Sequence, residues 1–444
     1  MNTDSFDGLI KTRRSFLRTT MLGAATSWTV PGFVQSTFLS MNAHAADSAV
    51  QATTGKDAPI LVLIQLAGGN DGLNTVVPYA DDNYYKARKV LGIKDKEVLR
   101  LGENAGLHPD LKFLHRAFQD GQLSVVQGVG YPNPNRSHFR STEIWTRATD
   151  ANRVGTTGWI GRYFDNACAG EDPTVGVALV DRQPDAFVAK NRPGIALKTP
   201  DLYRWMHGSD GAAEEEEMFR GMNAPDDDMS EAGSSISMVA GGNAGIGLGS
   251  AADSLKFLER TALDAQVSSD KIRELLAKSK VQVGYPGVPL GRSLQLVARM
   301  IEGGLPTRVF YVSHGGFDTH SGQKNAHATR LKQLDESLAA FQKDIAAQNA
   351  SDRVVVMTFS EFGRRVQENA NGGTDHGTAA PLFVLGGKIK GGLVGAQPSL
   401  TDLSNGDLKF NTDFRSVYAT LLEQWLQTKS APILGREFPK LAFL

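Results

Sequence analysis

Short apolar runs, each followed directly by a polar turn containing glycine, recur along this chain. The runs at 59–66 (PILVLIQL), 308–312 (RVFYV) and 353–359 (RVVVMTF) have the length and composition of strands buried on both faces. Between the last two runs, apolar residues at three- and four-residue spacing predict a long helix. These residues are Leu331, Leu334, Leu338, Phe341 and Ile345. A strand, a long helix and a second strand form a right-handed crossover, so the pattern predicts an α/β fold with a mostly parallel sheet.

The rest of the apolar pattern predicts further elements of the same kind. Strands are expected at 123–127, 174–180 and 381–385, and helices at 158–168, 255–280 and 291–302, with one more beginning at His108 and a last one capped by Asp413. The stretch 207–249 breaks the pattern, because it contains acidic runs and a segment rich in glycine, serine and alanine. We expect a mobile insertion there, at about 207–250, within a single domain spanning 46–444.

Acidic, amide and histidine side chains gather in the turns that follow or precede these strands. They are Asn70 and Asp71 after the first run, Asp318 and His320 after the second, Glu361 after the third, and Asp375 and His376 before the run at 381–385. Ligands of open α/β sheets bind outside the carboxyl ends of the strands. We therefore expect the turns after the second and third runs to share one crevice, with the loop at 373–378 nearby.

Several carboxylates in one crevice repel one another unless a cation or shared protons compensate their charge. Carboxylate together with imidazole is a normal ligand set for zinc, manganese or iron, so this cluster predicts a metal site. An alternative stays open for each residue taken singly. Asp318 and Asp375 could be turn or helix-cap residues, and the histidines could be ordinary hydrogen-bonded loop residues.

A second candidate site follows the strand at 123–127. Gly128 to Pro134 form a rigid loop of glycine and proline, and a helix is expected to begin near Ser137. Helix amino termini favour anions, so this is a place for a nucleophile or for a group that binds an oxyanion, with Arg136, His138 and Arg140 around it. Alternatively, Ser137 is simply the N-cap of the helix.

The amino terminus predicts where the protein goes. Arg13 and Arg14 lie in the segment Thr12–Arg18 (TRRSFLR), which precedes a mildly apolar stretch at 19–39 and the small-residue pattern Ala43-His44-Ala45. These features indicate a twin-arginine export signal at 1–45, cleaved after Ala45. We therefore expect the twin-arginine translocase as a partner during export, and a periplasmic or secreted mature protein without a stable membrane span.

Composition narrows the remaining possibilities. The 444 residues are 41% apolar and 21% charged, enough to bury a substantial core. A formal net charge of −1 gives no basic footprint for nucleic acid. The single cysteine, Cys168, excludes an intramolecular disulfide and a cysteine-rich zinc site, and we expect it to be a small buried side chain in a helix.

Five motifs, in order along the chain, resemble one known family. They are Asn70-Asp71-Gly72-Leu73-Asn74, Arg136-Ser137-His138-Phe139, Gly316-Phe317-Asp318-Thr319-His320, Ser360-Glu361-Phe362-Gly363-Arg364 and Gly373-Thr374-Asp375-His376-Gly377. From about residue 59 to 430 the chain resembles the family called domain of unknown function 1501. That family is grouped with the alkaline phosphatase and sulfatase superfamily, so the resemblance implies an α/β/α sandwich with a metal site at the carboxyl edge of the sheet.

The resemblance also implies roles for individual residues. The implied metal ligands are Asp71, Asp318, His320, Glu361 and His376, and Ser137 holds the position of the nucleophile. The chain departs from the superfamily in having Glu361-Phe362 where Asp-His is usual, in the two-residue spacing from Asp318 to His320, and in Asn70, which puts a second metal in doubt. It also lacks the Cys/Ser-x-Pro/Ala-x-Arg motif of sulfatases at Ser137.

The function expected from these features is an exported, metal-dependent hydrolase of phosphate or related esters. A divalent metal (zinc, manganese, calcium or magnesium) would bind the oxyanion and activate Ser137 or a water molecule. His138 would stand beside this site, and Arg136, Arg140 or Arg364 would hold the non-bridging oxygens. The alternative is a periplasmic binding or assembly protein that keeps the fold without turnover.

Overall fold

The computed structural model describes residues 58–168, 172–198, 271–279 and 283–444. Three predictions fall wholly or largely outside these residues: the export signal at 1–45, the insertion at 207–250 and most of the helix expected at 255–280. In the described part of the chain, no helix is both long and apolar enough to span a membrane.

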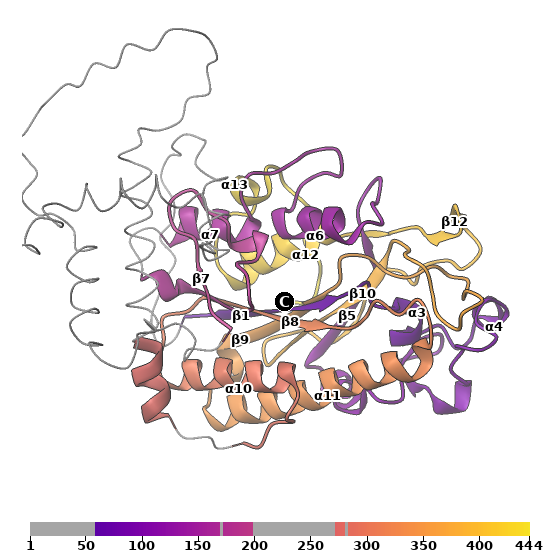
Figure 1. The fold of residues 1–444 in the computed structure, drawn as a ribbon, viewed down its shortest axis with the longest axis horizontal. Coiled ribbons are helices and arrows are strands. Elements are labelled where there is room, and N and C mark those ends of the chain that lie inside the picture. Colours follow the sequence, from indigo (N-terminus) through magenta and orange to yellow (C-terminus); the bar gives the residue numbers. More distant parts are fainter. Residues whose placement is uncertain (1–57, 169–171, 199–270, 280–282) are drawn as a thin grey trace, which may run out of the picture.

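A nine-stranded sheet is the centre of the described structure (Figure 1). In spatial order its strands are β11 (Gly392–Val394), β5 (Leu123–Gly130), β10 (Ala380–Gly386), β9 (Val354–Phe359), β1 (Ile60–Ala67), β8 (Val309–Gly315), β6 (Gly176–Leu179) and β7 (Ile195–Ala196), with β14 (Thr412–Asp413) added alongside β5. All neighbouring strands pair in parallel except that β10 is antiparallel to both β5 and β9. The predicted mostly parallel sheet is confirmed.

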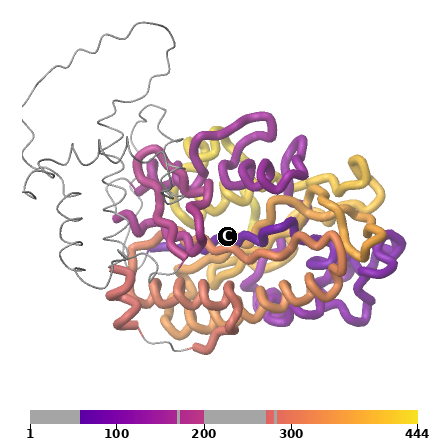
Figure 2. Tube along the Cα trace, in the orientation of Figure 1, coloured from indigo at the N-terminus to yellow at the C-terminus, as the bar shows by residue number. Residues whose placement is uncertain are grey.

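The strand β1 lies between the two strands whose crossover the sequence predicted. It pairs with β8 on one side and β9 on the other, and α11 (Gln323–Ala347) connects β8 to β9 along the chain. Figure 2 shows β1 in indigo crossing the molecule among the orange segments of the later sequence. The continuous apolar run of β1 follows from this central position, because both of its faces are covered.

Alternate residues of each strand feed two separate cores. Leu61 and Leu63 pack on one face, against α6 (His138–Arg147), α7 (Trp159–Ala167), α12 (Phe414–Thr420) and α13 (Ala431–Leu434). Ile60 and Val62 pack on the other, against α5 (Lys112–Gln119), α10 (Pro289–Glu302) and α11. Helices therefore cover both faces of the sheet, which is the expected α/β/α sandwich (Figure 1).

Smaller elements surround the sheet. Near the end of β1 lie α3 (Gly72–Thr75), β2 (Val76–Val77), α4 (Asp82–Ala87), β3 (Leu99–Arg100) and β4 (Gly106–Leu107), and β12 (Leu403–Ser404) pairs with β13 (Asp407–Leu408). Short 3₁₀ turns occupy Asp95–Glu97, Pro173–Val175, Asp185–Phe187 and Ser351–Arg353, and a π-helical turn follows α12 at Leu421–Trp425.

Local predictions are confirmed at some boundaries and wrong at others. Asp413 caps α12 by accepting a hydrogen bond from the Arg415 N–H at 2.9 Å, and Cys168 is buried at the end of α7. The helix expected to begin at His108 begins only at Lys112. The His108 side chain accepts a hydrogen bond from the Asp110 N–H at 3.1 Å and holds this segment as a turn.

In the described part of the central sheet, β10 is the one antiparallel strand, and its direction decides which loops meet. The carboxyl ends of β1, β5, β8 and β9 lie at one edge of the sheet, and the amino end of β10 lies at the same edge because β10 runs the opposite way. The loop at 373–379 therefore joins the turns that follow the parallel strands. These turns pack closely: Gly68 has φ +120°, and a Cβ there would lie 2.4 Å from the Asp318 nitrogen.

Candidate functional site

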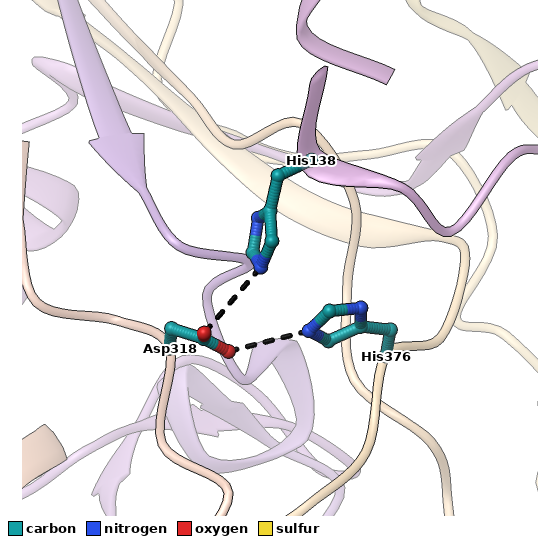
Figure 3. Close-up of side chains that lie close together, drawn as sticks. All are labelled: His138, Asp318 and His376. Carbon is teal, nitrogen blue, oxygen red and sulfur yellow. Dashed lines mark hydrogen bonds and ion pairs between the residues drawn. The ribbon is translucent and has the colours of Figure 1, made fainter. Parts of the chain in front are cut away.

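Side chains from three separate turns converge at this edge of the sheet. His138 comes from the first turn of α6, Asp318 follows β8, and His376 precedes β10 (Figure 3). The His138 Nε2 atom lies 3.5 Å from Asp318 Oδ2, and His376 Nε2 lies 3.2 Å from Asp318 Oδ1. One possible ligand atom from each residue lies within 4.8 Å of the others. The spacing suits one ion bound by all three side chains.

His320 brings a third imidazole to the same carboxylate. Its Nε2 atom lies 3.1 Å from Asp318 Oδ1 and 2.9 Å from His376 Nε2. His320 and Asp318 are each nearly half exposed, at 46% and 48% of their side-chain surface. The cluster is therefore open to solvent on the side of these two residues.

The other ring nitrogen of each histidine is held by an oxygen that can only accept a hydrogen bond. The Nδ1 atoms of His138, His320 and His376 lie 2.8 Å from Glu361 Oε1, 3.3 Å from Asp375 Oδ1 and 2.8 Å from the Arg136 carbonyl oxygen, respectively. An ionised carboxylate and a carbonyl oxygen both require N–H at Nδ1. In the neutral rings the lone pair is then on Nε2, which faces Asp318. Metal-binding histidines are held by outer partners in this way.

With the proton of each ring on Nδ1, the centre of the cluster contains several lone pairs and no proton between them. Lone pairs on His320 Nε2 and His376 Nε2 would face each other at 2.9 Å, beside the Asp318 carboxylate. His138 Nε2 is inaccessible to solvent and has no hydrogen-bond partner among the residues that the structure describes. Either a shared proton or a cation must lie among these atoms. One ligand atom each of His138, Asp318 and His376 lie within 4.8 Å of one another, and this donor set, with His320 beside it, fits a divalent transition metal.

Charges around the cluster keep Asp318 ionised. Partial burial raises the pKa of Asp318, but the hydrogen bond and the positive charge of Arg364 outweigh this effect and hold the pKa at about 2. The hydrogen bond to Glu361 raises the pKa of His138, whereas burial lowers the pKa of His376 despite its bond to the Arg136 carbonyl. Of these two imidazoles, His376 is therefore the easier to keep neutral, the form in which imidazole binds a metal.

The buried side chain of Arg364 forms hydrogen bonds with several of these turns at once. Its guanidinium donates to the carbonyl oxygens of Gly69 at 2.6 Å and Thr374 at 2.8 Å, and to Asp318 Oδ1 at 2.7 Å. It also donates to the carbonyl oxygens of Gly68 and Phe317. The side chain has no exposed surface. These contacts favour a role in positioning Asp318 over direct contact with a substrate.

Two of the five predicted metal ligands lie outside the convergence. Glu361 is buried behind His138, where its Oε1 accepts hydrogen bonds from His138 Nδ1 and, at 2.9 Å, from the Gly68 N–H. Asp71 is fully buried and pairs with Arg88. The structure thus brings together Asp318, His320 and His376 and adds His138, which the sequence placed beside the nucleophile.

The predicted catalytic residues near α6 differ in their exposure and in the hydrogen bonds that hold their side chains. Ser137 is exposed at the N-cap of α6, and its side chain makes no capping hydrogen bond. Arg136 is 44% exposed and lies 3.2 Å from Asp407. Arg140 donates to Glu143 at 2.6 Å and to the carbonyl oxygens of two residues in the following loop. Among the three arginines predicted to bind the ester oxygens, Arg136 is the most exposed.

The sequence named His138 only as a neighbour of the candidate nucleophile, and it did not name Asn369 at all. His138 follows the turn after β5, so its place at the carboxyl end of another strand was the signal for a ligand position. Asn369 gave no such signal. Its side-chain amide donates to the His320 carbonyl oxygen at 3.0 Å and to Asp375 Oδ1 at 3.1 Å, which fixes both residues. The Asn369 hydrogen bond also lowers the pKa of Asp375.

Comparison with known families supports part of the expected resemblance. The sequence model of a family described as "Protein of unknown function (DUF1501)" matches residues 249–433, which is less than half of the chain. The matched range includes the turns that carry Asp318, Glu361 and His376, whereas Asp71 and His138 lie outside it. No curated protein matches the sequence.

Solved structures that resemble this one share little sequence with it. A protein in the alkaline phosphatase superfamily from Vibrio parahaemolyticus is 9% identical with a TM-score of 0.35, over 96% of this chain and 78% of that one. Alkaline phosphatase from the Antarctic bacterium TAB5 is 10% identical with a TM-score of 0.28, over 74% and 92% of the two chains. A phosphonate monoester hydrolase from Silicibacter pomeroyi is 9% identical with a TM-score of 0.30, over 86% and 77%. These likenesses are distant, and a shared fold does not by itself fix the chemistry of a site.

Proposed function

We propose that this protein is an exported, metal-dependent hydrolase of phosphate or related esters. The observation that carries the proposal is the convergence of three imidazole Nε2 atoms on the Asp318 carboxylate, each imidazole being held at Nδ1 by an acceptor. Such an arrangement needs a cation or shared protons, and its exposed side is open to a substrate.

The proposed ligands are His138, Asp318, His320 and His376. A set with three imidazoles favours zinc or manganese over calcium or magnesium, which prefer oxygen ligands. A divalent metal held there would polarise an ester oxygen and lower the pKa of an attacking hydroxyl group or water. Glu361, Asp375 and the Arg136 carbonyl oxygen keep the three rings in the tautomer that such binding requires.

The residues at the start of α6 supply the rest of the proposed chemistry. Ser137 precedes the proposed ligand His138 and is exposed, so it is our candidate nucleophile. Free N–H groups in the first turn of a helix stabilise a nearby anion by about 0.3–1 kcal/mol. Arg136 can contact a non-bridging oxygen by exchanging its ion pair with Asp407 for one with the substrate. Arg140 and Arg364 would act by holding the surrounding loops.

Metal content and hydrolysis test this proposal together. The chain from Ala46 onward would be stripped with a chelator, reloaded with zinc or manganese, analysed for bound metal, and assayed with chromogenic phosphate monoesters, phosphate diesters and sulfate esters. We expect bound metal and turnover of at least one phosphate ester. Ser137→Ala should keep the metal and lose turnover. Retained turnover in that variant would identify a water molecule as the nucleophile.

Other outcomes count against the proposal. A protein that binds no divalent metal would overturn the metal centre. A protein that binds metal but hydrolyses none of the esters would support the alternative function, a binding or assembly protein with this fold.

Export by the twin-arginine pathway is a separate part of the proposal. It rests on Arg13 and Arg14 within the segment TRRSFLR and on the small-residue pattern that ends at Ala45. Changing both arginines to lysine should leave unprocessed protein in the cytoplasm, because a lysine ammonium does not reproduce the shape of a guanidinium. Normal processing of this double variant, seen by cell fractionation and protein size, would contradict this route.

A further inference from the structure

A second carboxylate at the same edge of the sheet has a different environment. Asp71 follows β1 and is fully buried together with Arg88. The Arg88 Nη1 and Nη2 atoms donate to the two oxygens of Asp71 at 2.5 Å and 3.1 Å. The Gln323 side-chain amide donates to Asp71 Oδ2 as well. Both carboxylate oxygens are therefore bonded to N–H groups of the protein.

The partners of Asp71 are themselves fixed. Arg88 also donates to the carbonyl oxygens of Val366 and Arg365, each at 2.7 Å. The Gln323 carbonyl oxygen accepts hydrogen bonds from Thr319 at 3.0 Å and Thr374 at 2.5 Å, so its NH₂ group must face Asp71. Each oxygen of Asp71 therefore has at least one fixed N–H partner, and the carboxylate has no exposed surface.

Charge in this buried network is balanced without an added ion. His327 lies next to it, and its Nε2 donates to the Asn70 side-chain oxygen at 2.9 Å. Burial lowers the pKa of His327 to about 4, so this ring is neutral near pH 7. Asp71 and Arg88 therefore compensate each other. A buried carboxylate with neither a metal nor a guanidinium beside it would be strongly destabilising.

We propose that the Arg88 guanidinium is the permanent cation of Asp71, so that this edge of the sheet binds one metal ion and not two. A guanidinium remains charged at any pH the protein meets, and its planar fork matches the two oxygens of a carboxylate. The guanidinium therefore compensates the negative charge of Asp71 as a second metal ion would. Unlike a metal ion, it cannot dissociate from the protein. This inference rests on the proposed metal centre but not on ester hydrolysis.

Hydrogen bonds also link the buried Asp71–Arg88 pair to the proposed metal centre. Thr374 donates through its hydroxyl group to Gln323, and its carbonyl oxygen accepts from Arg364 at 2.8 Å. Arg364 in turn donates to Asp318. A continuous chain of hydrogen bonds thus runs from Asp71 to the proposed ligand Asp318. Arg88 and Asp71 are positioning residues in this arrangement.

The test counts metal ions in a variant that removes both charges at once. Asp71→Asn combined with Arg88→Met keeps side-chain volume and leaves no buried charge unpaired, which either single change would do. Bound metal would be measured by elemental analysis and by titrating the metal-free protein with Co²⁺ while recording its visible absorption. Asp318→Asn serves as the comparison that should lose the ion.

We expect one metal ion per chain in the parent and one in the double variant, with affinities that agree within about tenfold, because only the outer support has changed. Two ions in the parent and one in the double variant would overturn the inference while leaving the proposed function intact. A loss of affinity well beyond the roughly 100-fold effect of an outer partner would make Asp71 a ligand and would also overturn it. A parent protein without metal would overturn the proposed function and this count together.

Discussion

Asp71 and Asp318 lie at the same edge of the sheet, after neighbouring parallel strands, and yet their surroundings are opposite. Asp71 has no exposed surface, and its oxygens accept N–H groups of Arg88 and Gln323. Asp318 is 48% exposed, and Arg364 donates to only one of its oxygens. Around Asp318 the remaining neighbours are imidazole nitrogens of His138, His320 and His376.

The comparison shows that a carboxylate at the end of a strand is not by itself a metal ligand. A guanidinium that donates one hydrogen bond to each carboxylate oxygen compensates the charge of the carboxylate permanently. Imidazole lone pairs directed at a carboxylate donate no hydrogen bond to it. An exchangeable cation or proton must therefore lie between them to compensate the negative charge. If this difference holds, Asp318 binds the metal ion and Asp71 only supports the surrounding structure, so changing each set of residues should have different effects.

The largest effect is expected from Asp318→Asn. This change removes the charge on which three imidazoles converge, so metal affinity should fall by more than the roughly 100-fold that loss of an outer partner causes. Metal content after dialysis and a Co²⁺ titration would measure it. Asp402→Asn, at an exposed carboxylate that pairs with Lys409, is the control and should bind metal like the parent. Equal metal content in both variants would refute the centre.

Arg364→Lys should mainly affect stability. Lysine cannot reproduce the hydrogen bonds to Gly69, Thr374 and Asp318, so we expect the free energy of unfolding to fall by about 3 kcal/mol. Urea denaturation of the metal-free proteins would measure this. The neighbouring change Arg365→Lys affects a partly exposed ion pair with Asp407 and should cost less than about 1 kcal/mol. A similar decrease in the free energy of unfolding of the two variants would show that the hydrogen bonds of Arg364 do not hold the turns together.

Glu361→Gln should weaken metal binding without abolishing it. The amide oxygen can still accept from His138 Nδ1, but the negative charge that makes this imidazole a stronger ligand is lost. A decrease of about 10- to 100-fold in affinity is expected for an outer partner. Glu368→Gln changes a carboxylate that accepts from the Val90 and Leu91 N–H groups, and it should leave affinity unchanged. If Glu361→Gln removed the metal as completely as Asp318→Asn, Glu361 would be a direct ligand.

The smallest effect concerns the buried network and pH. The pKa of His327 is about 4 in the folded protein, below its ordinary value of about 6.5 in the unfolded chain. Between these values the unfolded chain binds the extra proton, so stability falls as the pH is lowered from about 6.5 toward 4. This contributes at most about 1.4 kcal/mol per pH unit. His327→Asn should flatten the dependence of unfolding free energy on pH between 7 and 5, and parallel curves for the two proteins would contradict the assignment.

Much of the framework was readable in the sequence for a physical reason. Buried parallel strands need continuous apolar runs, and those at 59–66, 308–312 and 353–359 became β1, β8 and β9. The spacing of Leu331, Leu334 and Leu338 predicted α11 because a helix that covers a sheet repeats its apolar face every three or four residues. The twin-arginine pattern and the insertion near 207–250 remain predictions, since they lie outside the described residues.

The chemical groups at the ends of the strands follow from the sequence alone, because local patterns of apolar and polar residues define strands and their turns. The sequence also led us to expect that the turns after the second and third runs lie near the loop at 373–378, but which side chains touch one another depends on the tertiary structure. The antiparallel direction of β10 brings His376 to the edge where His138 and Asp318 lie, and no local pattern specifies that direction. Likewise, Arg88 is 17 residues from Asp71 and carries no motif, so its bond to that carboxylate depends on how the loops fold over the end of β1. Pairings of this kind are set by packing across the whole sheet, which a sequence pattern does not record.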